Sequence, residues 1–222
     1  MKQKIKSFLG DPRNDEYQAA LSFIGNVENQ KIADIACGTG TFISAIQQNN
    51  EVVGVDLNPV NVKYCKEIGY NVIEGNALNL SFSDESFDIV HSSHVMQVFA
   101  PNDGVRYLSE LLRICKTNGK VILTTLNDFS RFYRHPENVR PYPPDAILRL
   151  CSEAEGANSP MFNISKFEIG RIWLRRDPLF KLDTSVNFKR LGFYNAINRL
   201  QYKLLLRNYV KYSAYVMEIT KK

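Results

Sequence analysis

The sequence predicts an α/β fold with a parallel sheet, and three observations lead to this conclusion. Over residues 1–127, short apolar strand patterns alternate with helical patterns, as they do in βαβ units. A turn containing two glycines, Gly38-Thr39-Gly40, joins the first strand pattern to a helix. The chain has 222 residues, 44% hydrophobic and 23% charged, which suits a single globular domain over residues 1–222.

Each element of the first half has its own sequence signal. Strands are expected at residues 31–36, 52–57, 71–74, 87–92 and 120–126. Helices are expected at about residues 13–25, 41–48, 59–68 and 102–116. In the last of these, Val105, Leu108 and Leu112 recur at helical spacing and mark one apolar face. Pro59 suits a first helical turn, and Gly69 suits a helix end.

The regular alternation stops after residue 127. Residues 128–144 hold four prolines among Arg, Tyr and His, which indicates a loop that could serve as a lid. Beyond it we expect a helix at 145–155, extended chain at 162–174, a helix at about 187–206 and a last strand at 209–220.

Composition and charge exclude several classes of protein. No stretch reaches the roughly 20 apolar residues that span a bilayer, and the basic N-terminus precedes no apolar signal core, so we expect a cytoplasmic protein. The four cysteines form no Cys-x-x-Cys pair, and no carboxylate or histidine cluster has ligand spacing, so no metal site is expected. Residues 128–222 hold 17 Lys and Arg against 9 Asp and Glu, which indicates either an anionic partner or a solvated basic surface.

The glycine turn carries the strongest functional signal. Gly38 and Gly40 allow close approach of the backbone to a ligand, and the helix that follows directs free N–H groups at it. Asp56 ends the next strand, where it can accept hydrogen bonds from the two hydroxyls of a ribose. The dinucleotide fingerprint Gly-x-Gly-x-x-Gly is not met, because Ala36 and Ile43 stand where further glycines would be. The competing interpretation is that Asp56 merely caps the following helix.

Residues 32–127 resemble the class I S-adenosylmethionine-dependent methyltransferases, in particular the branch of ubiquinone-biosynthesis and small-molecule enzymes. Ala33–Gly40 is similar to the first family motif and Val53–Asn58 to the second. Gly75–Ala77 and Leu80–Val90 are similar to the stretch around the adenine, and Leu111–Lys120 to the helix and turn before strand five. The resemblance implies a three-layer Rossmann-like α/β/α fold, whose seven-stranded, mostly parallel sheet has an antiparallel last strand.

The resemblance also implies roles for parts of the chain. Residues 1–30 would form an N-terminal cap helix, 31–127 the cofactor-binding core, 128–206 the cover on the substrate side and 207–222 the last strand. Asp34 and the turn backbone would contact the amino-acid part of S-adenosylmethionine, and Asp56 its ribose. The complete set of implied cofactor-binding residues is Asp34, Ala36, Gly38, Gly40, Asp56, Leu57, Asn76, Ala77, Ser92 and Ser93.

Methyl transfer to a hydroxyl benefits from a base, and His94 is the candidate because it follows strand four, where the methyl group is expected. His91, three residues earlier, should face another way and point into the packing layer. Arg131, Arg134 and His135 follow strand five and are candidate contacts for an anionic substrate. These features favour methyl transfer to an oxygen of a small molecule, which could be an anionic, a sugar- or nucleotide-like, or a quinone-like metabolite.

Two other functions stay open at this point. An RNA methyltransferase would suit the basic second half and the segment Arg171–Arg176. Against it, the chain has no recognisable RNA-binding module and no Asn/Asp-Pro-Pro-Tyr/Phe motif after strand four, so we expect no nucleic-acid partner. A non-catalytic S-adenosylmethionine-binding protein would share the fold, since a fold alone never establishes activity.

Overall fold

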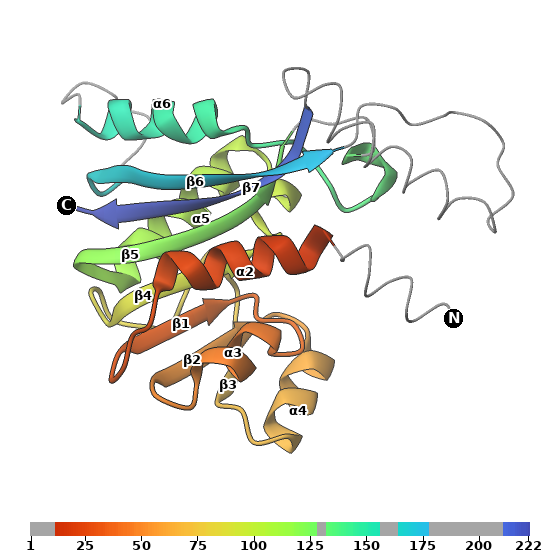
Figure 1. Cartoon of the computed structure of the whole chain (residues 1–222), viewed down its shortest axis with the longest axis vertical. Helices are drawn as coiled ribbons and strands as arrows, with labels where there is room; N and C mark the ends of the chain where they lie inside the picture. The colour runs from red at the N-terminus through yellow and green to blue at the C-terminus, as the bar shows by residue number, and fades with distance from the viewer. Residues whose placement is uncertain (1–11, 128–131, 156–163, 178–210) are drawn as a thin grey trace, which may run out of the picture.

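The computed structural model describes residues 12–127, 132–155, 164–177 and 211–222 (Figure 1). Seven strands form one sheet in the order β3-β2-β1-β4-β5-β7-β6. Their bounds are β1 Lys31–Ile35, β2 Glu51–Asp56, β3 Val72–Glu74, β4 Phe87–Ser93, β5 Cys115–Leu126, β6 Phe167–Asp177 and β7 Lys211–Lys221. Only β7 runs antiparallel to its neighbours, β5 and β6. The predicted mostly parallel sheet with an antiparallel last strand is confirmed.

Helices cover both faces of this sheet and make three layers. Their bounds are α2 Pro12–Ile24, α3 Thr41–Ile46, α4 Pro59–Glu67, α5 Pro101–Ile114 and α6 Pro144–Glu155. The helices α2, α3 and α4 pack on one face, and α5 and α6 on the other (Figure 1). Four of the five begin with proline, whose fixed φ and missing N–H suit a first helical turn. Among the described residues, no helix is long and apolar enough to cross a bilayer.

Strand alternation divides the core between the two faces. In β5, Val121 and Leu123 join the cluster under α5, whereas Ile122 between them joins the cluster under α2. In β7, Tyr215 and Val216 divide in the same way. All five residues are at most 2% exposed, so the centre of the sheet is buried on both sides. This burial explains why the central residues of β5 and β7 are mostly apolar.

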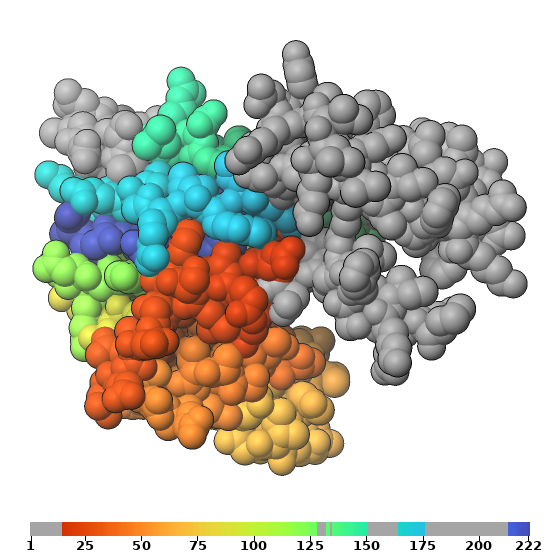
Figure 2. All heavy atoms as spheres, viewed as in Figure 1, coloured from red at the N-terminus to blue at the C-terminus, as the bar shows by residue number. Residues whose placement is uncertain are grey.

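The helix α2 is held over the sheet by both apolar and polar contacts. Its residues Ala20 and Phe23 are buried against the sheet. Arg171 of β6 lies over the Phe23 ring, 4.6 Å from its centroid, and donates a hydrogen bond of 2.7 Å to the Phe23 carbonyl. Figure 2 shows α2 (red) lying between β6 (cyan) and the segment that follows β1 (orange). The C-terminal half of α2 is therefore anchored by contacts of its own.

The largest differences between the predicted and the observed bounds are at the starts of two strands, β5 and β6. Strand β5 begins at Cys115, although the sequence predicts a helix to 116 and a strand from Lys120. The register with β4 shifts between these points, and Asn118 adopts φ 63, so the predicted Asn118-Gly119 turn exists as an irregularity within the strand. Strand β6 is Phe167–Asp177, later than the predicted 162–174. The helix expected at 187–206 lies outside the described residues.

The described part of the proline-rich loop is anchored to the core. Phe132, in the short 3-10 turn η2 (Phe132–Arg134), is fully buried against Leu126 and Ala214. The Tyr142 hydroxyl donates to the Ala100 carbonyl at 3.0 Å, and the Tyr142 carbonyl accepts from the Tyr215 hydroxyl at 2.6 Å. A lid over this stretch stays a prediction, because residues 128–131 are not described.

Candidate functional site

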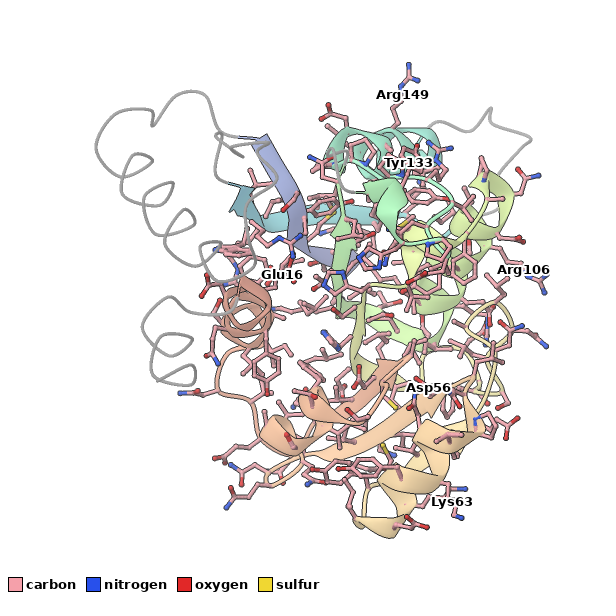
Figure 3. All side chains as sticks on the ribbon, turned by 90° about the vertical axis from the view of Figure 1, so that its right-hand side faces the viewer. Glu16, Asp56, Lys63, Arg106, Tyr133 and Arg149 are labelled. Carbon is pink, nitrogen blue, oxygen red and sulfur yellow. The ribbon has the colours of Figure 1, made fainter. Side chains whose placement is uncertain are left out.

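The glycine turn lies at the edge where the parallel strands end, which Figure 3 views directly. Ala36, Gly38 and Gly40 all adopt positive φ, of 58°, 55° and 77°. A Cβ at Gly40 would lie 2.5 Å from Cδ2 of Tyr70, so a side chain here would force a shift of Tyr70 in addition to the cost of the positive φ. A Cβ at Gly38 would meet nothing within 4 Å, so this glycine borders open space. The turn therefore has one glycine facing the protein and one facing a potential ligand.

Asp56, labelled in Figure 3, fixes the glycine turn to the end of β2. Its Oδ2 accepts from the Gly38 N–H at 2.7 Å. Its Oδ1 accepts from the Asn58 N–H at 2.9 Å and from Asn61 Nδ2 at 3.1 Å. The cap of α4 is Asn58, whose Oδ1 accepts from the Val60 N–H at 2.9 Å, so Asp56 is not the helix cap of the competing interpretation. A carboxylate offers about four acceptor sites, so three bonds leave capacity for a ribose hydroxyl.

A pocket of about 340 Å³ opens beside the turn, a size within the range of small-molecule sites. Its lining comes from α2, the end of β1, the glycine turn, the start of α3 and the end of β4. The charged or titratable residues that line it are Glu16, Tyr17, Asp34, Cys37, His91 and His94. The helix α2 thus contributes a wall of the pocket, which the sequence did not predict.

Asp34 and His91 form a buried pair at the base of this pocket. Their side chains are 3% and 6% exposed, and His91 Nδ1 lies 2.7 Å from Asp34 Oδ1. A carboxylate can only accept, so His91 Nδ1–H donates. The His91 ring stacks on Phe42 with centroids 3.6 Å apart. His91 is buried as predicted, but it also lines the pocket, which the sequence did not predict.

The second oxygen of Asp34 is the feature most suggestive of a ligand. Oδ2 is buried and, within the described part of the chain, has no hydrogen-bond partner. A buried carboxylate oxygen without a donor is costly, and such a group calls for a missing partner. The ammonium of an amino-acid moiety would supply the donor and the opposite charge. The residues present therefore fit the methionine part of S-adenosylmethionine.

His94 lies in the same pocket, beyond the end of β4. It adopts φ 58, which removes it from the strand alternation and explains why His91 and His94 line one pocket instead of facing apart. Its Nε2 lies 2.9 Å from Oε2 of Glu16 on α2. The other Glu16 oxygen lies 2.9 Å from Nη1 of Arg175 in β6. Glu16 and Arg175 were not predicted, and no local sequence signal identifies them.

Burial also raises the pKa of two groups in the pocket wall, the thiol of Cys37 and the phenol of Tyr17. Burial, together with the charges of Asp34 and Asp56, raises the pKa of Cys37 far above its usual range. Burial and the Asp34 charge raise the pKa of Tyr17 as well. Both groups are therefore neutral at physiological pH, and neither supplies a charged nucleophile or base.

The two serines at the end of β4 have different positions. Ser93 lines the pocket, and its contact with the cofactor stays a prediction. Ser92 is fully buried, donates to the Ile35 carbonyl at 2.6 Å and accepts from the Tyr107 hydroxyl at 2.6 Å. The prediction that Ser92 faces the cofactor is therefore corrected, because strand alternation directs its hydroxyl into the sheet and toward α5.

The residues expected around an adenine lie along the ends of β2 and β3. Leu57 is 66% exposed, which is high for a leucine and leaves it free to pack on a ligand. Asn76 Oδ1 accepts from the Leu78 N–H at 2.9 Å and closes a local turn that includes Ala77. An adenine contact by these residues stays a prediction.

The candidate substrate contacts after β5 are only partly described. Arg131 and the side chain of Arg134 lie outside the described residues. His135 is exposed, and its Nδ1 lies 3.7 Å from Glu137 Oε1, so an acidic neighbour already offsets its charge when protonated. Their role in binding an anion stays a prediction.

Comparisons with known proteins agree with this geometry. A family model described as a methyltransferase domain matches residues 33–123. The chain is similar to a phthiotriol/phenolphthiotriol dimycocerosates methyltransferase 1 of Mycobacterium ulcerans, with 27% identity over 64% of this chain and 48% of that protein. It is also similar to a demethylmenaquinone methyltransferase of Bacillus velezensis, with 32% identity over 54% of this chain and 55% of that protein. The chain thus spans about half the length of these relatives.

Solved structures share the whole fold at lower identity. A SAM-dependent methyltransferase from Archaeoglobus fulgidus aligns over 98% of this chain and 97% of its own, with a TM-score of 0.62 and 23% identity. The YcgJ protein from Bacillus subtilis aligns over 94% and 99%, with a TM-score of 0.65 and 16% identity. Residues 33–123 therefore match a methyltransferase domain, and the solved structures share the fold of the chain.

Proposed function

We propose that this chain transfers the methyl group of S-adenosylmethionine to a hydroxyl oxygen of a small molecule. When bound, S-adenosylmethionine supplies a methyl group bonded to a positively charged sulfur, and this sulfur is the leaving group when an acceptor oxygen takes the methyl group. The observation that carries the proposal is the coexistence, in one pocket of about 340 Å³, of the unpartnered Asp34 oxygen and the His94 imidazole. The first group suits the donor molecule, and the second suits the acceptor.

The cofactor-binding roles follow from the contacts around the glycine turn. Asp34 Oδ2 would accept a hydrogen bond from the ammonium of the methionine part. Asp56, with acceptor capacity left, would bind the ribose, and the backbone at Ala36, Gly38 and Gly40 would follow the ligand closely. Leu57, Asn76 and Ala77 would contact the adenine, and Ser93 the side of the methyl donor.

His94 is the candidate base. Its Nε2 is occupied by Glu16, so Nδ1 would accept the proton that the acceptor hydroxyl releases. A positioned base typically contributes a rate factor of about 10² to 10⁴. Positioning of donor and acceptor supplies the remainder, because methyl displacement needs no covalent intermediate with the protein.

Small molecules are the favoured acceptor class, for two reasons. The relatives described above are named for phthiotriol/phenolphthiotriol dimycocerosates and for demethylmenaquinone. Two arginines of β6 that could form part of a nucleic-acid surface, Arg171 and Arg175, are also engaged. Arg171 pairs with Glu218 and lies over Phe23, and Arg175 pairs with Glu16. These contacts weaken the case for RNA as the acceptor.

An anionic acceptor is a finer proposal, which rests on Arg131, Arg134 and His135. Arginine binds phosphate or carboxylate through two parallel hydrogen bonds. If the acceptor is anionic, Arg131→Ala and Arg134→Ala should raise its KM without changing cofactor affinity. An unchanged KM in both variants would remove this part of the proposal.

The test is a labelling experiment with methyl-¹³C S-adenosylmethionine. The protein is incubated with an extract of the organism that encodes it, separated into lipid, polar small-molecule, RNA and protein fractions. We expect label in a small-molecule or lipid fraction, as a methyl carbon bonded to oxygen, and none with His94→Asn. Label in RNA or protein, or no label in any fraction, would contradict the proposal.

A further inference from the structure

We propose that Glu16 is a positioning residue, which fixes His94 in the one neutral form that can accept a proton inside the pocket. This inference rests on the proposed function, because it assigns His94 the role of base. Glu16 lies on α2, 78 residues before His94 (Figure 3), and both residues line the pocket. The Glu16 carboxylate accepts from His94 Nε2 at 2.9 Å, so Nε2 carries the hydrogen and Nδ1 is the bare nitrogen.

The charge of Glu16 is held in place from its other side. Its side chain is 3% exposed, and burial of an unpaired carboxylate would be costly. Arg175 Nη1 lies 2.9 Å from Oε1, the oxygen that does not face His94. Arg175 is itself oriented by a hydrogen bond of 2.8 Å from Nε to Ser213 Oγ. Oε2 of Glu16 thus bonds to His94, whereas Oε1 lies in the ion pair with Arg175 and has no hydrogen bond among the described residues. The charge of Arg175, rather than a second hydrogen bond, orients the carboxylate.

The backbone of His94 is fixed equally well. Its N–H donates to the Thr124 carbonyl at 2.8 Å, and its carbonyl accepts from Gln97 Nε2 at 2.6 Å. Gln97 is buried, and its Oε1 accepts from Thr125 Oγ1 at 3.1 Å. These bonds hold His94 at φ 58, where a residue other than glycine is uncommon. Because the backbone and Nε2 of His94 are both held by hydrogen bonds, Nδ1 is the ring nitrogen at which a proton can be accepted.

The chemistry parallels the histidine of a Ser-His-Asp triad, in which the carboxylate selects the tautomer and stabilises the imidazolium that forms. Here the two ring nitrogens exchange roles, because the carboxylate binds Nε2 and leaves Nδ1 for the acceptor hydroxyl. The carboxylate acts through His94 rather than on the acceptor itself. Its contribution is the orientation and protonation state of His94.

A purely structural role for Glu16, such as docking α2, would predict a different outcome. The docking of α2 already has contacts of its own, namely the buried Ala20 and Phe23 and the Arg171 bond to the Phe23 carbonyl. Loss of the Glu16 charge should therefore leave the pocket in place. The measurement must therefore report which ring nitrogen of His94 carries the hydrogen, and not only the stability of the variant.

The variant Glu16→Gln is expected to change the tautomer of His94. Arg175 only donates, so it would take the amide oxygen and turn the amide NH₂ toward His94. An NH₂ group needs an acceptor, so His94 Nε2 would become the bare nitrogen and Nδ1 would carry the hydrogen. The variant should therefore invert the tautomer and leave His94 without a lone pair at Nδ1. Glu16→Asp keeps the charge and should keep the tautomer.

The experiment is long-range ¹H–¹⁵N NMR of the full chain labelled with ¹⁵N-histidine, with the His94 signals assigned from His94→Asn. We expect a protonated Nε2 in the wild type and in Glu16→Asp, and a protonated Nδ1 in Glu16→Gln. The matched control is Asp15→Asn, because Asp15 is the exposed neighbour of Glu16 on α2 and should leave the wild-type pattern unchanged. S-adenosylhomocysteine should bind all variants within about twofold of the wild-type Kd, which serves as the check of folding.

Turnover gives the second readout, with the labelled fraction from the experiment above as acceptor. The kcat of Glu16→Gln should fall by about 10² or more, with a much smaller change in KM, since a base is lost but the binding surface is kept. A wild-type ring protonated at Nδ1, or an unchanged tautomer and kcat in Glu16→Gln, would overturn the inference. If the wild type itself transfers no methyl group, the proposed function fails, and the NMR result still decides whether Glu16 sets the tautomer.

Discussion

The Asp34 carboxylate and the His91 imidazole share a hydrogen bond of 2.7 Å at the base of the pocket, and both side chains are buried. The bond uses one oxygen of Asp34 and directs the other, Oδ2, to a position without a partner among the described residues. Phe42 of α3 stacks on the imidazole and prevents it from turning away. The pair thus prepares a single anionic acceptor for a cationic ligand group.

Asp34→Asn should weaken the binding of S-adenosylhomocysteine by about 10- to 100-fold, because a hydrogen bond to a charged group contributes about 1.5–3 kcal/mol. Isothermal titration calorimetry measures the change. The matched control is Asp88→Asn, because Asp88 pairs with Lys116 and the Lys31 N–H at the start of β4, away from the pocket. Equal affinity in Asp34→Asn and the wild type would show that Oδ2 faces no ligand.

Gly38→Ala should remove cofactor binding at a modest cost in stability. The left-handed conformation disfavours alanine by about 1–2 kcal/mol, and the new Cβ meets no protein atom within 4 Å. Gly69→Ala is the control, since Gly69 also has positive φ and open surroundings but lies outside the pocket. Urea unfolding should give similar losses for the two variants, while calorimetry should detect ligand binding only in Gly69→Ala. Binding by both would mean that the open space at Gly38 is not the ligand site.

Gly40→Ala should be more destabilising than either of these variants. It adds to the conformational cost a contact of 2.5 Å between Cβ and Cδ2 of Tyr70. The double variant Gly40→Ala/Tyr70→Ala should recover part of the extra loss, and a double-mutant cycle of urea midpoints measures the coupling. Strict additivity would mean that Tyr70 moves aside freely and that packing does not require this glycine.

The buried thiol of Cys115 predicts how the free energy of unfolding depends on pH. Burial raises the pKa of Cys115 to about 12, whereas an unfolded cysteine titrates near 8.5. Above pH 8.5 the unfolded chain loses this proton and the native chain keeps it, so the free energy of unfolding falls as pH rises. Between pH 8 and 9.5 this one thiol should account for about 1 kcal/mol of the fall.

The control for this prediction is Cys115→Ala. The variant should be less stable at both pH values, because it leaves a cavity at a fully buried site. Its free energy of unfolding, from urea titrations at pH 8 and 9.5, should nevertheless depend less steeply on pH than that of the wild type. An equally steep dependence would assign the effect to other groups.

The sequence predicts those parts of the site that are built from residues near one another in the chain. Gly38, Gly40 and Asp56 belong to a strand, a turn and the next strand, so local spacing brings them together. The contact between Glu16 and His94 joins residues 78 apart and depends on how α2 docks, which no local pattern encodes. The wrong expectation for Ser92 has a different cause. It treats both serines as pocket residues, although adjacent strand residues face opposite sides of a sheet.

The central claim is that this pocket binds S-adenosylmethionine, and calorimetric titration of the wild type and Asp56→Ala with this compound tests it most directly. We predict one binding site in the wild type and at least a tenfold weaker Kd in Asp56→Ala, which loses both the ribose contact and the bond that fixes Gly38. The absence of binding to the wild type, or an unchanged Kd in Asp56→Ala, would contradict the account.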